Sequence, residues 1–237
     1  MVLYQPQNGY CYNSDTHFLY HFIVQNLNTF KNNQGQLLDI GSGSGILGLL
    51  IKRDFPKFHL NQSEVQEEFI WLSSKNAQTN GLKNKMYEGN FLTQSFEQKQ
   101  FDICVSNPPF YHGSVIKSEN KILKIARYND SMPLEKFIQK TYDILKPKGK
   151  FFFCYDVKQI NDIMLLLNKY KFNIESMQFI YPKRDRDATL VLVYARKNSK
   201  SLTKVFPPLM VFENEDFTQD VQNIYEKTQT HSIKVEI

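Results

Sequence analysis

A strand-like run that ends in three glycines constrains this chain more than any other feature of its sequence. Residues 36–40 form the apolar run, and residues 46–52 have the spacing of a helix. Between them stand Gly41, Gly43 and Gly45. Glycines in such a turn leave out the Cβ atoms that would keep a ligand away from the backbone. Because ligands of open α/β sheets bind at the carboxyl ends of strands, the turn predicts a ligand site.

The turn differs from the common phosphate-binding patterns. Its spacing is GxGxG, not the GxGxxG of dinucleotide sites, and it lacks the GK[ST] of a phosphate-binding loop. An acid, Asp39, stands before the first glycine. A carboxylate repels phosphate, so we expect a cationic ligand group near the turn. The ammonium and sulfonium of S-adenosylmethionine are such groups.

The rest of the chain alternates strand-like runs with helix-period segments. Strands separated by helices of about 10–15 residues indicate a parallel sheet with helices on both faces. A short charged turn between the last two strands indicates one antiparallel strand. The expected strands are 58–63, 85–88, 101–106, 150–155, 174–181 and 189–195, and the expected helices are 67–80, 134–145 and 157–170.

The remaining residues flank this core. We expect residues 35–198 to form the core and residues 1–34 to form an N-terminal segment that covers the substrate and cofactor. Residues 199–237 should form a strand (205–212) and a helix packed on the core. Phe217, Val221, Ile224 and Tyr225 would lie on the apolar side of that helix.

Composition excludes several classes of protein. The 237 residues are 41% hydrophobic and 22% charged, which is unlike collagen or extended low-complexity chains. No apolar run approaches the roughly 18–20 residues that cross a bilayer, and the start lacks signal-peptide features. Cys11, Cys104 and Cys154 are scattered, and the pair His17 and His21 lacks a third ligand. We therefore expect free thiols in the cytoplasm, no membrane contact and no metal.

Polar residues also stand at two other predicted strand ends. Glu64 ends the second strand, where a carboxylate can accept hydrogen bonds from both ribose hydroxyls of a nucleoside. Asn90 ends the third strand, where it can meet an adenine amino group, and Phe91 follows it. Together with the glycine turn, these residues favour a nucleoside-containing cofactor.

These residues resemble the class I S-adenosylmethionine-dependent methyltransferases. Residues 39–45 are similar to the first motif of that family, and residues 63–65 with 76–81 are similar to the second. The resemblance covers residues 35–196 and implies a Rossmann-like, seven-stranded, mostly parallel sheet. Asn90 departs from the aspartate that is frequent in the family. The cofactor contacts that the resemblance implies are Asp39, Gly41, Gly43, Gly45, Glu64, Asn90, Phe91 and Asn107.

The sequence Asn107-Pro108-Pro109-Phe110 resembles the motif of family members that methylate a planar amino nitrogen. This resemblance implies that all four residues are catalytic. Such a nitrogen is a poor nucleophile because its lone pair is delocalised. The Asn107 side-chain oxygen and the Pro108 carbonyl could each accept one N–H and stabilise the positive charge that develops on the nitrogen. Phe110 offers a face on which a flipped base can stack.

Three substrate classes share this motif: adenine N6 in nucleic acid, guanine N2 in ribosomal RNA, and the glutamine of release factors. Residues 107–111, 126–128 and 134–149 resemble bacterial tRNA (adenine-N6)-methyltransferases of the valine-tRNA type. That resemblance implies a tRNA substrate, and we expect a monomer or weak dimer. The two other methyltransferase activities, and a cofactor-bound RNA-binding protein without turnover, remain alternatives.

Basic and aromatic residues supply candidate substrate contacts. The net charge of +5 weakly favours a polyanionic partner. One basic cluster comprises Lys117, Lys121, Lys124 and Arg127, which share a face if residues 114–127 are helical, and the other comprises Lys183, Arg184 and Arg186. Acids are interspersed with both clusters, so solvated surface is an equally strong interpretation of them. The candidates are Tyr10, Tyr111, Lys117, Lys121, Lys124, Arg127, Lys183, Arg184 and Arg186.

Overall fold

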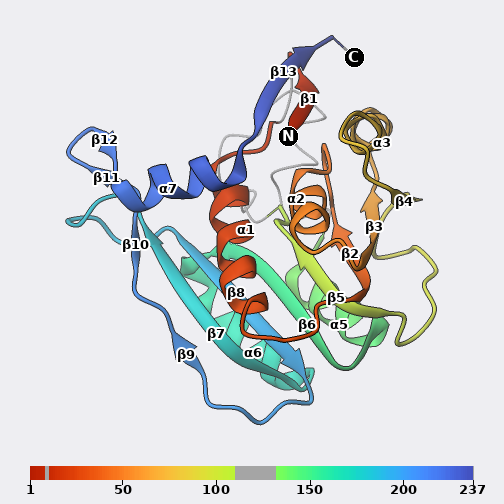
Figure 1. Cartoon of the computed structure of the whole chain (residues 1–237). Coiled ribbons are helices and arrows are strands. Elements are labelled where there is room, and N and C mark those ends of the chain that lie inside the picture. The colour runs from red at the N-terminus through yellow and green to blue at the C-terminus, as the bar shows by residue number, and fades with distance from the viewer. Residues whose placement is uncertain (9–10, 110–131, 237) are drawn as a thin grey trace.

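The centre of the computed structural model, which describes residues 1–8, 11–109 and 132–236, is an open sheet (Figure 1). Its long strands are β2 (Gly35–Ile40), β3 (Phe58–Glu64), β4 (Asn84–Glu88), β5 (Phe101–Ser106), β6 (Leu145–Asp156), β7 (Phe172–Tyr181) and β8 (Leu190–Lys197). They lie in the order β7-β8-β6-β5-β2-β3-β4. β8 is antiparallel to β6 and β7, and the other neighbours are parallel. The predicted α/β class and mostly parallel sheet are confirmed.

Two short strands extend the sheet beside β7, where a single strand over residues 205–212 was expected. They are β9 (Lys204–Val205) and β10 (Leu209–Met210), and both pair with β7. Pro207 and Pro208 separate them. Proline has no N–H to give to a strand ladder, so one continuous strand cannot form here.

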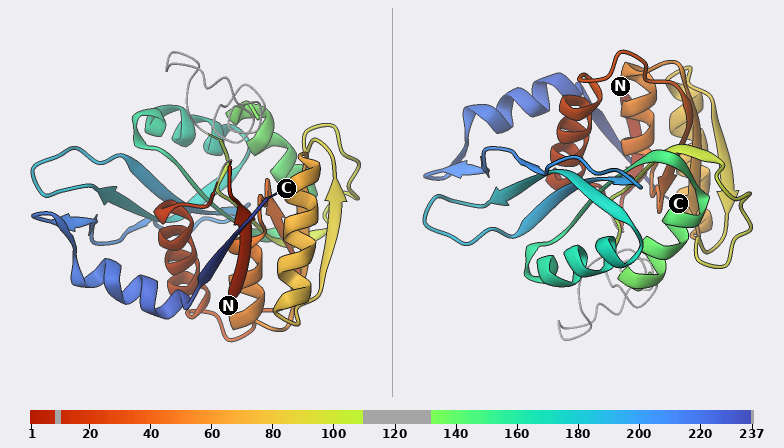
Figure 2. Two further views of the ribbon diagram at one scale, coloured as in Figure 1. Left: turned by 90° about the horizontal axis from the view of Figure 1, so that it is seen from above. Right: turned by 90° about the horizontal axis from the view of Figure 1, so that it is seen from below.

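Helices cover both faces of the sheet, as expected. Figure 2 shows α5 and α6 on one face and α1, α2 and α3 on the other. Apolar spacing explains these positions: in α5 the buried side chains include Leu134, Phe137, Ile138 and Thr141, at steps of three and four residues. The helices are α1 (Ser14–Leu27), α2 (Ile46–Asp54), α3 (Glu67–Thr79), α5 (Leu134–Ile144), α6 (Ile160–Lys169) and α7 (Gln219–Thr228), with a 3-10 turn, η2 (Val157–Gln159), before α6.

The two ends of the chain pair with each other. β1 (Val2–Pro6) lies parallel to β13 (His231–Val235), as Figure 1 shows. The other edge of β1 is bonded by two asparagines of the α3 region. Asn76 and Asn80 each accept a backbone N–H of β1 and donate to a carbonyl of β1. The two side-chain amides therefore make the hydrogen bonds that a neighbouring strand would make on this edge of β1. The sequence predicted neither β13 nor this pairing.

The C-terminal extension places Phe217 differently from the expectation. Phe217 belongs to β12 (Asp216–Phe217), which pairs with β11 (Phe212–Glu213), and its side chain is partly exposed. The Thr218 hydroxyl accepts from the Val221 N–H and caps α7, so the helix begins after Phe217. Val221 and Ile224 are buried, and α7 contacts α1. The division into 1–34, 35–198 and 199–237 stays a prediction.

A close contact joins the start of α2 to the sheet. The Gly48 N–H donates to the Asp39 carboxyl at 2.9 Å. A Cβ at Gly48 would lie 2.8 Å from Leu60 Cδ1 and 3.0 Å from Asp39 Cβ. Helix α2 can therefore approach β2 and β3 this closely because residue 48 has no side chain.

We expect Gly48→Ala to lower the free energy of unfolding. Overpacking of a core typically costs about 1–3 kcal/mol, which outweighs the gain in helix propensity of about 1 kcal/mol. Urea unfolding would measure the difference. Ser74→Ala, at an exposed position of α3, is the control for propensity alone. An unchanged midpoint for Gly48→Ala would contradict the close packing.

The Asp39 carboxyl predicts a pH dependence of stability. Burial raises the pKa of Asp39 from 3.8 to about 7. A raised pKa means that Asp39 stabilises the fold when neutral, and that this contribution is lost as the pH rises from about 4 through 7. The stability of wild type relative to Asp39→Asn should therefore fall across that range and then level off. Unfolding measured at several pH values tests this, and a pH-independent difference would refute it.

Candidate active site

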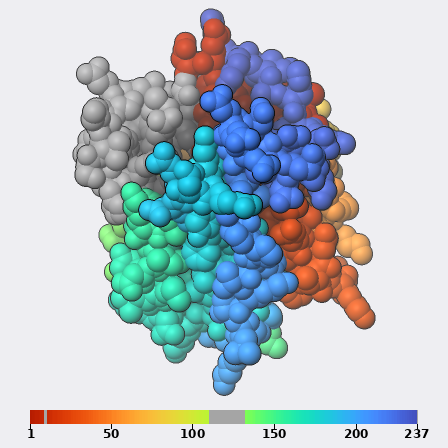
Figure 3. Space-filling model, turned by 90° about the vertical axis from the view of Figure 1, so that its left-hand side faces the viewer, coloured from red at the N-terminus to blue at the C-terminus, as the bar shows by residue number. Residues whose placement is uncertain are grey.

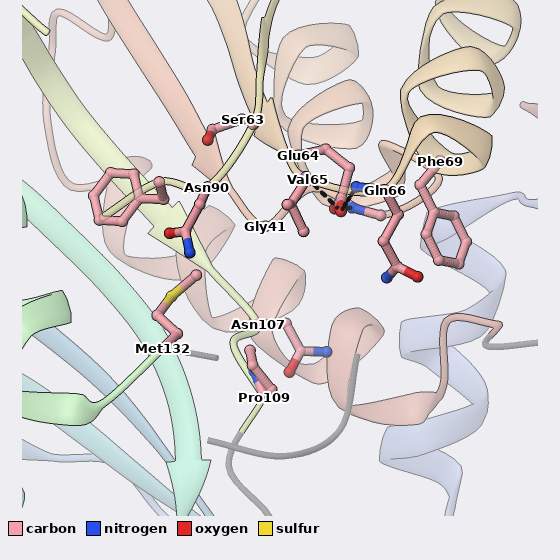
Figure 4. A pocket seen from close by; sticks show the side chains of 13 residues that line it. Gly41, Ser63, Glu64, Val65, Gln66, Phe69, Asn90, Asn107, Pro109 and Met132 are labelled. Carbon is pink, nitrogen blue, oxygen red and sulfur yellow. Dashed lines mark hydrogen bonds between the residues drawn. The ribbon is translucent and has the colours of Figure 1, made fainter. Parts of the chain in front are cut away.

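A cavity of about 230 Å³ lies at the carboxyl ends of β2, β3, β4 and β5. Many of the residues predicted from sequence as cofactor or catalytic contacts come together here. Figure 4 shows the side chains around this space, with Asn107 and Pro109 across from Glu64. The predicted residues that line the cavity are Gly41, Gly43, Glu64, Asn90, Phe91, Asn107 and Pro109.

The glycine turn combines a left-handed backbone with open space. Gly41, Gly43 and Gly45 have φ values of 66°, 53° and 87°, a region that other residues rarely adopt. A Cβ at Gly43 would meet nothing within 4 Å, so the turn leaves room for a ligand there. Gly45 is packed more closely than Gly43, because a Cβ at this position would lie 2.5 Å from the Ser73 hydroxyl oxygen. Gly45 thus lets α3 approach and does not line the cavity.

Asp39 is turned away from the main cavity. It is buried, accepts from the Gly48 N–H at 2.9 Å and lies 3.5 Å from Nε2 of Gln62. It lines only a smaller adjoining cavity of about 40 Å³, among the cavities of the described residues. The Ser42 hydroxyl lines the same small cavity, is buried, and has no hydrogen-bond partner among the described residues.

Glu64 holds the glycine turn to the end of β3. One carboxylate oxygen accepts from the Gly43 N–H at 2.9 Å, and the other accepts from the N–H groups of Val65 and Gln66 at 2.8 and 3.0 Å. Burial raises the pKa of Glu64 in spite of these donors. A carboxylate offers about four acceptor positions. Three of these positions already accept backbone N–H groups. If both hydroxyls of a ribose bond Glu64, one hydroxyl therefore has to share an acceptor position with a backbone N–H.

The Asn90 side chain presents a donor to the cavity. Its oxygen accepts from the Leu92 N–H at 2.8 Å, which leaves the Nδ2 group as the donor it can offer. A donor suits a ring nitrogen of adenine better than the amino group that the sequence suggested. Phe91 and Phe69 supply apolar surface beside it.

The Asn107 side chain is held from two sides. Its Nδ2 donates to the Thr16 hydroxyl of α1 at 3.0 Å, and its Oδ1 accepts from the Cys154 thiol of β6 at 3.0 Å. The Ser106 hydroxyl bonds the Ile40 carbonyl at 2.7 Å, which ties the end of β5 to the end of β2. Pro108 is buried beside Asn107.

The predicted substrate contacts fall into two groups. Lys183, Arg184 and Arg186 are exposed in the turn between β7 and β8. Because β7 is oriented like β5, this turn lies at the carboxyl edge of the sheet. Figure 3 shows the hairpin (cyan) at the surface beside the C-terminal segment (blue). The other predicted residues lie outside the described residues: Tyr10, Phe110, Tyr111, Lys117, Lys121, Lys124 and Arg127.

Several residues of the site were not predicted. Phe69 and Met132 line the main cavity, and Thr16 and Cys154 bond Asn107. Thr16 and Cys154 lie 91 and 47 positions from Asn107, so no local pattern could have indicated them. The α-helical period of residues 67–80 marks Phe69 only as an apolar position.

Three findings concern metals, the buried His17 and membranes. Within the described ranges, no group of three or more His, Cys, Asp or Glu side chains could hold a metal ion. Burial lowers the pKa of His17 to about 4. None of the helices in the described part of the chain is long and apolar enough to cross a membrane.

Two named relatives show what this chain is similar to. A tRNA1(Val) (adenine(37)-N6)-methyltransferase of Pedobacter heparinus is 26% identical over 141 residues, which cover 59% of this chain and 60% of that protein. A release factor glutamine methyltransferase of Flavobacterium psychrophilum is 26% identical over 182 residues, which cover 73% of this chain and 64% of that protein. In both matches the chain spans less than two thirds of the relative's length.

A solved structure and a family match agree on the fold. A structure described as a predicted O-methyltransferase from Agrobacterium tumefaciens superposes with a TM-score of 0.67 at 16% identity, covering 93% of this chain and 100% of that chain. Residues 19–170 match the family described as "Methyltransferase small domain". This family implies S-adenosyl-L-methionine as the methyl donor. The chain therefore belongs to the methyltransferase small domain family.

Proposed function

We propose that this chain transfers a methyl group from S-adenosyl-L-methionine to the exocyclic N6 of an adenine in tRNA, in the cytoplasm. One observation carries the proposal. Asn107 and Pro109, in the Asn107-Pro108-Pro109 corner at the end of β5, line the same cavity as Gly41 and Gly43 of the glycine turn. An amine-binding corner and a cofactor turn thus share one space.

The residues of the cavity fit the cofactor. Gly43 and Gly89 leave open space where a Cβ would stand. Glu64 can accept from the ribose, Asn90 can donate to a ring nitrogen, and Phe91 gives the base an apolar neighbour. When bound, the cofactor supplies an electrophilic methyl group on its sulfonium. The proposed contacts do not include Gly45, which faces α3.

The corner residues act on the amine. The Asn107 Oδ1 and the Pro108 carbonyl are acceptors, so each can take one N–H of an amino group. Two such hydrogen bonds direct the nitrogen lone pair toward the donor methyl. Fixed dipoles of this kind stabilise the positive charge that develops on the nitrogen. Pro109 has no N–H that would compete with the amine.

The choice of tRNA rests on the relatives and on charge. The Pedobacter heparinus relative is named for adenine 37 of a valine tRNA. The exposed Lys183, Arg184 and Arg186 lie at the same edge of the sheet as Asn107, where they can contact phosphates. We also propose that residues 1–34 cover the site, because Tyr12 and Thr16 line the small cavity.

A second candidate substrate is the glutamine side chain of a release factor. It presents the same planar N–H₂ group, and a relative of this chain carries that name. The two substrates differ in size and charge, so the labelled product distinguishes them.

Asn107→Ala should lower methyl transfer by at least about 100-fold, the effect of losing one fixed dipole in a transition state. The affinity for the cofactor should change little. Methyl-labelled S-adenosyl-L-methionine, incubated with total tRNA from a strain lacking the gene, measures transfer. Nucleoside analysis should show N6-methyladenosine with wild type.

Three results would argue against this proposal. Near-normal transfer by Asn107→Ala would remove the asparagine from the chemical step. Label in release factor but not in tRNA would select the glutamine activity. Absence of labelled product with every substrate would favour a cofactor-bound binding protein.

Glu64→Gln should weaken binding of S-adenosyl-L-homocysteine by about tenfold, since hydrogen bonds to a charged group contribute about 1.5–3 kcal/mol. The side-chain N–H₂ of the introduced glutamine would also face the N–H of Gly43, or those of Val65 and Gln66, and two donors cannot bond each other. Calorimetric titration measures the affinity. Glu67→Gln, at an exposed position at the start of α3, is the matched control. Equal affinities of the two variants would remove Glu64 from the cofactor site.

A further inference from the structure

We propose that Thr16 and Cys154 fix the orientation of the Asn107 side-chain amide and are positioning residues for methyl transfer. The catalytic part of this inference rests on the proposed function. Three segments meet at this point: α1 supplies Thr16, the end of β5 supplies Asn107, and β6 supplies Cys154. Both hydrogen bonds are 3.0 Å long.

The two ends of an amide have opposite hydrogen-bonding character. Only the oxygen can accept an N–H, so an amide turned by 180° would present its own N–H₂ to an amine substrate. With Nδ2 bonded to the Thr16 hydroxyl, Oδ1 is directed at the Cys154 thiol, and Asn107 lines the cavity. The thiol occupies one lone pair of Oδ1, and the second lone pair is left for the substrate.

Both partners of the Asn107 amide are buried. Cys154 is fully buried, and Thr16 is 4% exposed. Water therefore cannot replace either partner easily. Burial also raises the pKa of the Cys154 thiol, and the nearby Asp15 adds to this effect. The thiol thus keeps its proton and remains a donor.

Both partners stand on rigid elements. Cys154 pairs with Leu192 of β8 in the middle of the sheet, and its neighbour Phe153 pairs with Ser106 of β5. Thr16 lies in the first turn of α1, which packs on the sheet. Precise side-chain geometry at a site depends on such supported partners. The amide is therefore held in place before a substrate arrives.

Substitutions separate positioning from mere packing. Cys154→Ala and Thr16→Val should each lower kcat by about tenfold, since small misplacements of a reacting group cost up to about 100-fold. The KM for S-adenosyl-L-methionine should stay within about twofold of wild type. Cys154→Ser puts a hydroxyl in place of the thiol, and Thr16→Ser keeps the hydroxyl, so both variants should retain most of kcat. The double variant Thr16→Val/Cys154→Ala should lose less than the product of the single effects, because both act on one amide.

Cys104→Ala is the matched control. Cys104 is an equally buried thiol on the neighbouring strand β5, so its loss tests the effect of a missing core sulfur. This variant should keep kcat. Normal kcat in Cys154→Ala, or a Cys154→Ser variant as impaired as Cys154→Ala, would overturn the proposal.

A second measurement is independent of activity. In ¹H–¹⁵N spectra of protein labelled at asparagine, the Asn107 side-chain protons should exchange with water at least about tenfold faster in Cys154→Ala and Thr16→Val than in wild type. Unchanged exchange would overturn the proposed orientation. If wild type methylates no tRNA, the proposed function fails, and this exchange measurement still decides whether Thr16 and Cys154 hold the amide.

Discussion

The parallel pairing of β2 with β3 and β5 is the constraint on which the site depends. In this register Asp39 pairs with Gln62 on one side and with Val105 on the other. The three strands therefore end at the same level, and the residues that follow them meet at one edge. The glycine turn, Glu64 and Asn107 come from different parts of the sequence, and the register brings them together at this edge.

Hydrogen bonds then connect the strand ends to one another. The N–H groups of Gly41 and Ser42 donate to the Ser63 carbonyl at 2.8 and 3.0 Å, and the Gly89 N–H donates to the Glu64 carbonyl at 2.8 Å. Asn76, which bonds β1, also donates to the Ser44 carbonyl of the glycine turn at 2.8 Å. The terminal strands thus support the turn through one buried amide. Such preformed contacts reduce the ordering that ligand binding requires.

Local patterns in the sequence predicted the core better than the periphery. The strand Phe101–Ser106 was predicted to the residue, because an apolar run and a following proline pair define both ends. The pairing of β1 with β13 and the bonds of Asn107 to Thr16 and Cys154 join positions far apart in the chain. No periodicity encodes such contacts. Asp39 shows a further limit, since its place before the glycines did not reveal that it bonds α2.

The central claim is that the cofactor and the asparagine–proline corner share one cavity. A crystal structure of the chain soaked with S-adenosyl-L-methionine tests it most directly. The account predicts electron density for the donor between Glu64 and Asn90, with its methyl group facing the Asn107 Oδ1 and the Pro108 carbonyl. Density for the donor elsewhere, or a methyl group directed away from this corner, would contradict it.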